Sequence, residues 1–592
     1  MRKAHSFHIP VMGIGFTIDS PIKVAQLGID SVVSLVDDEL MEKLRKVYSK
    51  KFMFNYIEIS NKINDYRAKR ITSYLNLLKD ISEQKLEELK KSANGIKEYF
   101  KLFPNDISEN EFLEKDMHLG SIDVNIMTKV DKENFKDKVL LPLEYNDAHA
   151  ALRGYANSKL NTSLIFSAGM NPKLYTYIES FEDFYPNKEG KINKKIVIKV
   201  SDYRSALIQG KFLAKKGIWV SEFRIESGLN CGGHAFATNG FLMGPILAEF
   251  RDNKENIINE LHPIFTAALE SKGKIIPKAP LPIKYSAQGG VGTAEEHEFL
   301  LSHYELDAVG WGSPFLLVPE ATTVDKDTIE KLKAAKEDDL YLSDISPLGV
   351  PFNNLRGNSK DLEKEANINK KRPGSSCPKK YLAQNKEFTE QSICTASRQY
   401  QHFKIQELQE ENLPDAEYEK KYNKITEKSC ICVGLGTSAL LNQDIDTRKE
   451  GPGVSICPGP NMAYFSKEMT LKEMTDHIYN RANMITRTDR PNMFIKELRL
   501  YVNDFKNKID DLSSDNMKKQ LKQIKSYNDN LQTGINYYKQ VFLHQTQYFK
   551  KQKADIIEEL EKSKNQLCNW IDKIELTVES FYLKSLEPVP LS

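Results

Sequence analysis

A histidine that follows a pair of glycines is the residue with the clearest chemical potential in this 592-residue chain. The stretch Gly228-Leu-Asn-Cys-Gly-Gly-His234 comes directly after a β-like run at 218–225. Paired glycines let a backbone pass close to a bulky planar ligand, and the next side chain is an imidazole that titrates near neutral pH. We therefore expect His234 to face a ligand and to move a proton. The alternative is a core histidine with one buried hydrogen bond.

Two more glycine-rich turns follow consecutive β-like runs further along the chain. The first contains Gly289-Gly290 and precedes a helix expected from residue 294, and the second contains Gly310, Gly312 and Ser313. In a barrel of alternating strands and helices, the turns after the seventh and eighth strands meet a helix amino terminus. Inward-pointing N–H groups and the helix dipole bind phosphate there. The two turns together predict a phosphate site.

The elements that must position these residues alternate between strand and helix. Eight β-like runs, each followed by a helical stretch, predict an α/β fold of the (β/α)₈ TIM barrel type, whose reactive groups lie at the carboxyl ends of the strands. The runs are 9–12, 31–35, 124–127, 164–167, 196–200, 219–225, 283–287 and 307–311. We expect the barrel to span 1–360. A lysine- and glutamate-rich helical insertion at about 57–115 would form a lid or an interface.

The remainder of the chain divides into two further segments. We expect a loop-rich, cysteine-containing cap or extension at 361–490, and a helical carboxyl-terminal region at 491–592 that packs and forms a homodimer. Within the cap, the apolar run at 429–439 reads as a packing turn. Arg398 and His402 either line the mouth of the active site or lie on a solvated helix face.

Five of the seven cysteines fall within residues 377–457. Thiolates are ligands for iron–sulfur clusters and for zinc, so these five are candidate metal ligands. Their spacing is irregular and includes no Cys-x₂-Cys pair, which leaves buried or incidental thiols as the alternative. The candidates are Cys377, Cys394, Cys430, Cys432 and Cys457.

Composition narrows the class of protein. The chain is 40% hydrophobic and 28% charged, with a formal net charge of +2, which is typical of a soluble globular protein with no excess field for nucleic acid or anionic lipid. No apolar run reaches the ~18 residues that span a bilayer, and the first ten residues lack the apolar core of a signal peptide. We expect a cytoplasmic protein without nucleic-acid or membrane partners.

With these motifs in order, the chain resembles the nitronate monooxygenase family, flavin-dependent (β/α)₈ enzymes that include flavin-dependent enoyl-acyl-carrier-protein reductases. The stretch 228–234 is similar to the family signature Gly-x-x-Ala-Gly-Gly-His, in which the histidine is catalytic. Cys231 stands where the family usually has alanine, and Asn230 replaces a frequent glutamate, so the polarity beside the histidine differs. The resemblance implies FMN as cofactor. It implies as FMN contacts Met12, Gly13, Asn125, Lys199, Gly232, Gly233, Gly289, Gly290, Gly310, Gly312 and Ser313.

These implications favour an FMN-dependent oxidoreductase of the nitronate monooxygenase-like group, with His234 acting on a small-molecule or acyl-thioester substrate. For an acidic carbon compound, a neutral imidazole would remove a proton. For an enoyl thioester or similar activated double bond, a protonated imidazole would stabilise the developing enolate during reduction. A flavin-binding scaffold with little turnover is a third alternative.

Overall fold

Eight parallel strands close into a barrel in this computed structural model, which describes residues 5–104, 116–167, 169–512, 517–545 and 547–586. Strand β1 pairs with both β2 and β10 and so closes the ring. The first strand lies two residues earlier than expected because Pro10 has no N–H for a strand ladder. The strands are β1 (Phe7–Ile9), β2 (Asp30–Ser34), β3 (Ile122–Met127), β6 (Ser163–Ser167), β7 (Lys195–Val200), β8 (Val220–Glu226), β9 (Lys284–Gln288) and β10 (Ala308–Gly310). The (β/α)₈ class is confirmed.

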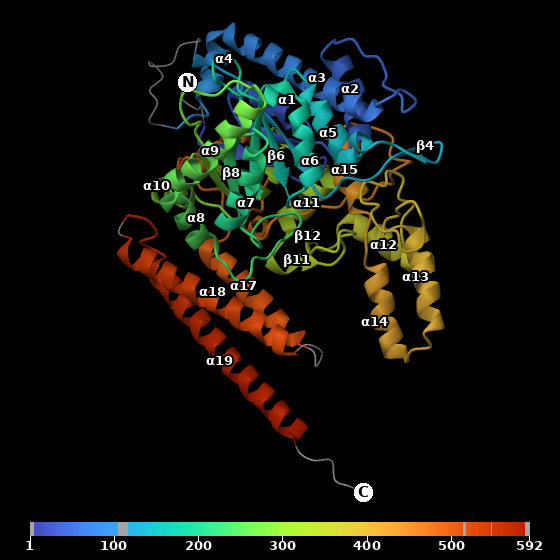
Figure 1. The fold of residues 1–592 in the computed structure, drawn as a ribbon, viewed down its shortest axis with the longest axis vertical. Helices are drawn as coiled ribbons and strands as arrows, with labels where there is room; N and C mark the ends of the chain where they lie inside the picture. The colour runs from blue at the N-terminus through green and yellow to red at the C-terminus, as the bar shows by residue number, and fades with distance from the viewer. Residues whose placement is uncertain (1–4, 105–115, 168, 513–516, 546, 587–592) are drawn as a thin grey trace.

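Helices between the strands surround the barrel (Figure 1). Helix α3, within the expected insertion, packs against both α2 and α5 and buries one face, with Ile71, Leu75 and Leu78 at helical spacing. Residues 66–90 are thus part of the barrel wall, and 105–115 lie outside the described residues. The helices are α1 (Ser20–Val24), α2 (Asp38–Lys51), α3 (Tyr66–Lys90), α4 (Ala93–Phe100), α5 (Asp147–Ala156), α6 (Pro172–Tyr177), α7 (Tyr203–Ala214), α8 (Met243–Asp252), α9 (Lys254–Ser271), α10 (Ala294–His303) and α11 (Lys326–Ala334).

The segment after the barrel is more helical than its sequence suggested. An antiparallel hairpin, β11 (Leu340–Ser343) and β12 (Phe352–Leu355), leads into five helices. They are α12 (Ser359–Asn369), α13 (Arg398–Glu410), α14 (Asp415–Thr426), α15 (Ile431–Asn442) and α16 (Leu471–Ile478). The expectation of a packing turn at 429–439 was wrong, because Gly434 and Gly436 lie inside α15. This helix is buried on all sides, so its sequence has no apolar periodicity to reveal it.

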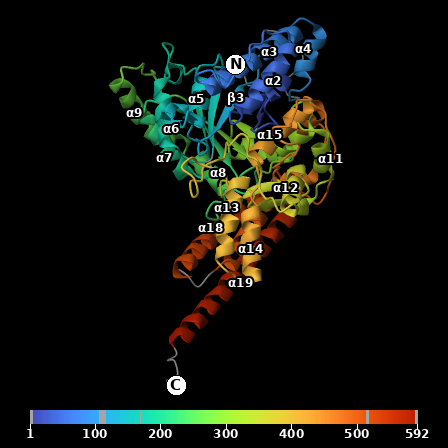
Figure 2. The ribbon, with the colours of Figure 1, turned by 90° about the vertical axis from the view of Figure 1, so that its right-hand side faces the viewer.

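The carboxyl-terminal region is helical, as expected, with α17 (Met493–Asp510), α18 (Met517–His544) and α19 (Lys553–Leu586). Helix α17 packs against α8 of the barrel, whereas α19 extends away from the barrel, on the same side as the α13–α14 hairpin (Figures 1 and 2). Among the described residues, no helix is both long and apolar enough to cross a membrane.

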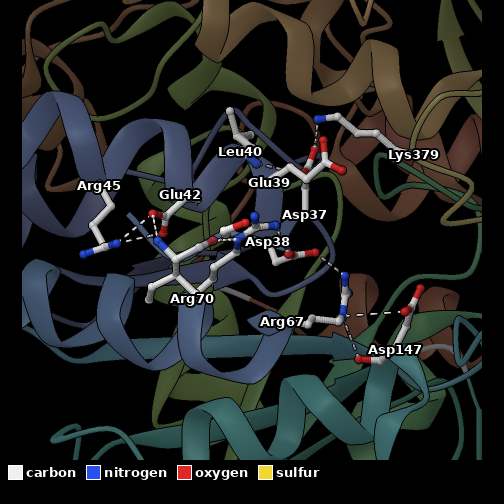
Figure 3. Close-up of polar contacts among 12 residues, drawn as sticks. Asp37, Asp38, Glu39, Leu40, Glu42, Arg45, Arg67, Arg70, Asp147 and Lys379 are labelled. Carbon is white, nitrogen blue, oxygen red and sulfur yellow. Dashed lines mark hydrogen bonds and ion pairs between the residues drawn. The ribbon is translucent and has the colours of Figure 1, made fainter. Parts of the chain in front are cut away.

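A buried ion pair joins the barrel to the cap. Asp37 caps helix α2 by accepting the Leu40 N–H at 2.8 Å, and its other carboxylate oxygen meets Nζ of Lys379 at 2.5 Å (Figure 3). The Tyr381 hydroxyl donates to the same carboxylate at 2.9 Å. Although burial opposes ionisation, the Lys379 ammonium holds the pKa of Asp37 below its usual range. The pair is therefore charged near neutral pH.

The neighbouring residue Asp38 extends this network through the barrel wall. Its two oxygens accept from Arg67 at 2.5 Å and Arg70 at 2.9 Å, both from α3 (Figure 3). Arg67 also lies 3.7 Å from the carboxylate of Asp147 at the start of α5. Four segments, α2, α3, α5 and the cap loop, thus meet in one set of buried charges.

Replacing Lys379 by alanine leaves the Asp37 carboxylate buried without its cation. Removing one partner of a buried pair costs about 3–5 kcal/mol, so we expect a large fall in the urea midpoint of unfolding. A matched control is Lys386→Ala, whose pair with Glu133 is 54% and 40% exposed. An exposed pair contributes about 0–1 kcal/mol. Equal midpoints for the two variants would contradict a structural role of Lys379.

Candidate functional site

A cleft lies at the carboxyl ends of the barrel strands. One part, of about 110 Å³, runs along the glycine turns, and a second, of about 320 Å³, reaches His234. The two parts share Lys199, Glu226, Gly232 and Gly233, so they form one continuous space. A space of a few hundred Å³ is typical of a small-molecule site.

The cleft brings together the barrel residues selected from the sequence. Asn125 and His234 line the part with the larger volume. The glycine-turn part is lined by Met12, Gly13, Lys199, Gly232, Gly233, Gly289, Gly290, Gly310, Gly312 and Ser313. Their assignment as ligand contacts stays a prediction.

His234 is half-buried and lines the cleft. Its Nε2 lies 2.7 Å from Oγ of Ser346, and its ring packs edge-on against Phe352 with centroids 4.8 Å apart. Burial lowers the pKa of His234 to about 4, so the imidazole is neutral at pH 7. Both partners come from the segment after the barrel, and the sequence carries no local signal that pairs them with the histidine.

The two glycines before His234 serve different purposes. A Cβ at Gly232 would lie 2.6 Å from the carbonyl oxygen of Cys457, so this glycine lets the cap loop cross the turn. Gly233 has a left-handed backbone (φ +77°), and a Cβ there would meet nothing within 4 Å. Its N–H donates to the same Cys457 carbonyl at 3.0 Å. Only Gly233 therefore leaves open space on the cleft side.

An ion pair lies in the middle of the cleft. Nζ of Lys199 is 2.7 Å from Oε1 of Glu226, which also accepts from Nε2 of Gln288 at 2.5 Å. Sequence reasoning missed Glu226, although it is the last residue of β8 and follows the expected strand by one position. Its position at the carboxyl end of a barrel strand could have identified it as a candidate site residue.

Three buried amide oxygens in the cleft have no hydrogen-bond partner among the described residues: Oδ1 of Asn125, Oδ1 of Asn230 and Oε1 of Gln288. Buried polar atoms in proteins are nearly always hydrogen-bonded, so such atoms beside a cavity suit a ligand that donates to them. Together with the open space at Gly233, they fit a planar ligand with polar edges.

Two backbone donors directly before α10 are already in use. The carboxylate of Glu296 accepts the N–H groups of Gly292 at 2.9 Å and Thr293 at 3.2 Å, and Arg490 neutralises it at 2.8 Å. The phosphate site expected at this helix terminus stays a prediction. Gly289 and Gly290, before the helix, still line the cleft.

Four of the five cysteines lie together. The Cys377 thiol makes hydrogen bonds with the thiols of Cys394 and Cys430, and Cys430 makes one with Cys432. Cys457 lies apart from them and lines the cleft beside Gly233. All five are free buried thiols. In the described parts of the chain, no group of three or more His, Cys, Asp or Glu side chains is arranged to hold a metal ion. The expected iron–sulfur or zinc site at Cys377, Cys394, Cys430, Cys432 and Cys457 is therefore not shown by the described residues.

A buried glutamate from α17 supports the base of the histidine turn. Glu497 accepts from Oγ of Ser227 at 2.5 Å and from the N–H of Met243 at 2.9 Å. Ser227 in turn accepts the N–H of Asn230 at 3.2 Å. Burial raises the pKa of Glu497 to about 7. In the sequence, only its place as a charged residue on the apolar face of the expected helix could have indicated that Glu497 has a structural role.

Comparisons with known proteins find no matching family model and no matching curated protein. The solved structures that resemble the chain include the following three. FabK from Thermotoga maritima is 13% identical, with 80% of this chain and 92% of that chain covered and a TM-score of 0.34. The enoyl reductase domain of MlnA, from the macrolactin cluster of Bacillus amyloliquefaciens, is 12% identical, with coverages of 81% and 94% and a TM-score of 0.38. Nitroalkane oxidase from Streptomyces ansochromogenes is 10% identical, with coverages of 60% and 78% and a TM-score of 0.30.

At these TM-scores the likenesses establish neither the fold nor the function of this chain. The barrel is defined by its own strand order, and the site by the residues that line its cleft. Together they define the chain as a (β/α)₈-barrel protein with a small-molecule cleft at the carboxyl ends of the strands.

Replacing Glu497 by glutamine removes its titration. Because the folded-state pKa is raised from 4.5 to about 7, the stability from the neutral carboxyl is fully present below about pH 4.5 and is lost as pH rises through 7. This loss is on the order of 3 kcal/mol by pH 8. We expect Glu497→Gln to lose less stability than the parent protein between pH 5 and 8 in urea unfolding. The control Glu330→Gln, at a 68% exposed side chain, should follow the parent, and identical pH dependence in Glu497→Gln would refute the assignment.

Proposed function

We propose that the chain is an FMN-dependent oxidoreductase of the nitronate monooxygenase-like group, acting on a small molecule with an acidic C–H bond. One observation carries the proposal: Lys199, the neutral His234 and the glycine turns meet in one cleft at the carboxyl ends of the strands. When bound, FMN supplies the electron transfer that no side chain of the protein provides.

The cleft residues fit such a cofactor. Gly289, Gly290, Gly312 and Ser313 line the glycine-turn part, where backbone N–H groups would hold a phosphate. Lys199 would hold the polar edge of the ring system, and the buried Oδ1 of Asn125 would accept a hydrogen bond from it. The space over Gly233 would admit the plane of the ring.

The electrostatics of His234 support the removal of a proton. An imidazole with a pKa of about 4 is neutral at pH 7, so it has a lone pair that can accept a proton from a substrate carbon; because this pKa makes it a weak base, the substrate needs an acidic C–H bond. The Ser346 hydroxyl, 2.7 Å from Nε2, fixes the ring orientation. Reduction of an enoyl thioester with a protonated imidazole requires the form that burial disfavours.

The substrate class is tested with protein reconstituted with FMN and kept anaerobic. We expect a primary nitroalkane to bleach the flavin absorption, because the substrate passes its electrons to the flavin once its acidic proton is removed. Bleaching by NADPH alone, with recovery on adding an enoyl thioester, would replace the proposal with the reductase alternative. If the protein does not retain FMN after reconstitution, both the proposed function and the reductase alternative are overturned.

Replacing His234 by alanine should leave the FMN content unchanged and lower kcat on a neutral nitroalkane by about 10²–10⁴-fold, the usual contribution of a general base. The preformed nitronate anion has already lost the proton, so its oxidation should fall far less. His544→Ala, at an exposed position on α18, is the matched control. Equal losses on the nitroalkane and its nitronate would rule out a role as base.

A further inference from the structure

A second cavity, of about 970 Å³, lies in the cap between the α13–α14 hairpin and the loop at 371–380. None of its lining residues lines the barrel cleft. Helix α13 contributes Arg398, His402 and Ile405, whose spacing of four and three residues places them on one helix face. Arg398 and His402 therefore belong to this separate cavity and not to the mouth of the barrel site.

The cavity is strongly cationic. Lys371, Arg372, Lys380 and Arg398 line it, against a single acidic lining residue, Glu419. Within the described part of the chain, none of these four cations has a side-chain hydrogen bond or ion pair, and Nε of Arg398 is buried without a partner. An unpaired buried donor is costly, so an anion that accepts from Nε of Arg398 would relieve this penalty, and the exposed cations Lys371, Arg372 and Lys380 would attract it.

The opposite wall is aromatic. Tyr418 and Tyr422, one turn apart on α14, are half-buried and stack with ring centroids 6.1 Å apart and an interplanar angle of 21°. Ile393 and Ile405 add apolar surface. Aromatic faces bind planar rings, whereas guanidinium groups bind phosphate through paired hydrogen bonds. The cavity therefore combines recognition of a ring with recognition of phosphate.

We propose that this cap cavity binds a nucleotide, with its phosphates at Arg372 and Arg398 and its ring against Tyr418 and Tyr422. The inference stands on cavity residues alone and does not depend on the proposed flavin function. The adenosine diphosphate group is common to reduced nicotinamide dinucleotides and to coenzyme A thioesters. The proposal therefore names the adenosine diphosphate group, and the experiment distinguishes which of the two kinds of molecule carries it.

The test uses the full chain as purified, freed of unbound FMN, and measures binding of ADP by titration calorimetry. We expect ADP to bind more tightly than inorganic phosphate or adenosine alone, because both walls contribute. The double variant Arg372→Gln/Arg398→Gln should weaken ADP binding at least about tenfold, as expected for lost charge-assisted hydrogen bonds. An unchanged flavin absorption spectrum or, failing flavin binding, an unchanged unfolding midpoint shows that the variant is folded.

Arg204→Gln, at an exposed arginine on α7, is the matched control and should bind ADP like the parent protein. Parallel titrations with NADPH and coenzyme A identify which whole molecule gains affinity over ADP. Three results would overturn the proposal: no ADP binding, ADP binding no tighter than inorganic phosphate, or equal ADP affinity in the double variant and the control. The titration needs no turnover, so its failure is distinguishable from failure of the flavin assignment.

Discussion

The arrangement of the barrel and the cap depends on the buried ion pair between Asp37 and Lys379. Their side chains are 0% and 1% exposed, so neither charge can be solvated while the two segments stay together. A buried charge without its partner is strongly unfavourable, which ties the cap loop to the start of α2. Asp38 continues the same constraint through Arg67 to the barrel wall (Figure 3). The cap is thus fixed over the carboxyl ends of the strands.

The β11–β12 hairpin and the cap complete the site that the barrel begins. In the hairpin, Ser346 orients His234, and the amide of Asn353 donates to the carbonyl oxygens of Cys231 at 2.9 Å and Gly233 at 3.2 Å. From the cap, the carbonyl of Cys457 receives the N–H of Gly233. Burial lowers the pKa of His234. The surroundings of His234 are therefore set by the hairpin and the cap as well as by the barrel.

Much of the barrel could be predicted from the sequence, because the strands are short apolar runs and the turns after β8, β9 and β10 carry their own glycines. Parallel strands in a closed barrel have their carboxyl ends on one rim, so His234 and the turns at Gly289 and Gly312 were bound to meet. Helix α15 escaped prediction because a helix buried on all sides has no apolar periodicity.

The sequence by itself determined the fold class, the histidine turn and the two glycine turns, since each depends on residues a few positions apart. The tertiary structure alone decided which charges are paired. Lys379 meets Asp37 across the molecule, whereas Arg398 has a buried Nε with no partner in the described chain. It also decided that Glu226 pairs with Lys199 and that Ser346 reaches His234. The physical reason is that burial and pairing arise between segments far apart in the chain, so no local pattern records them.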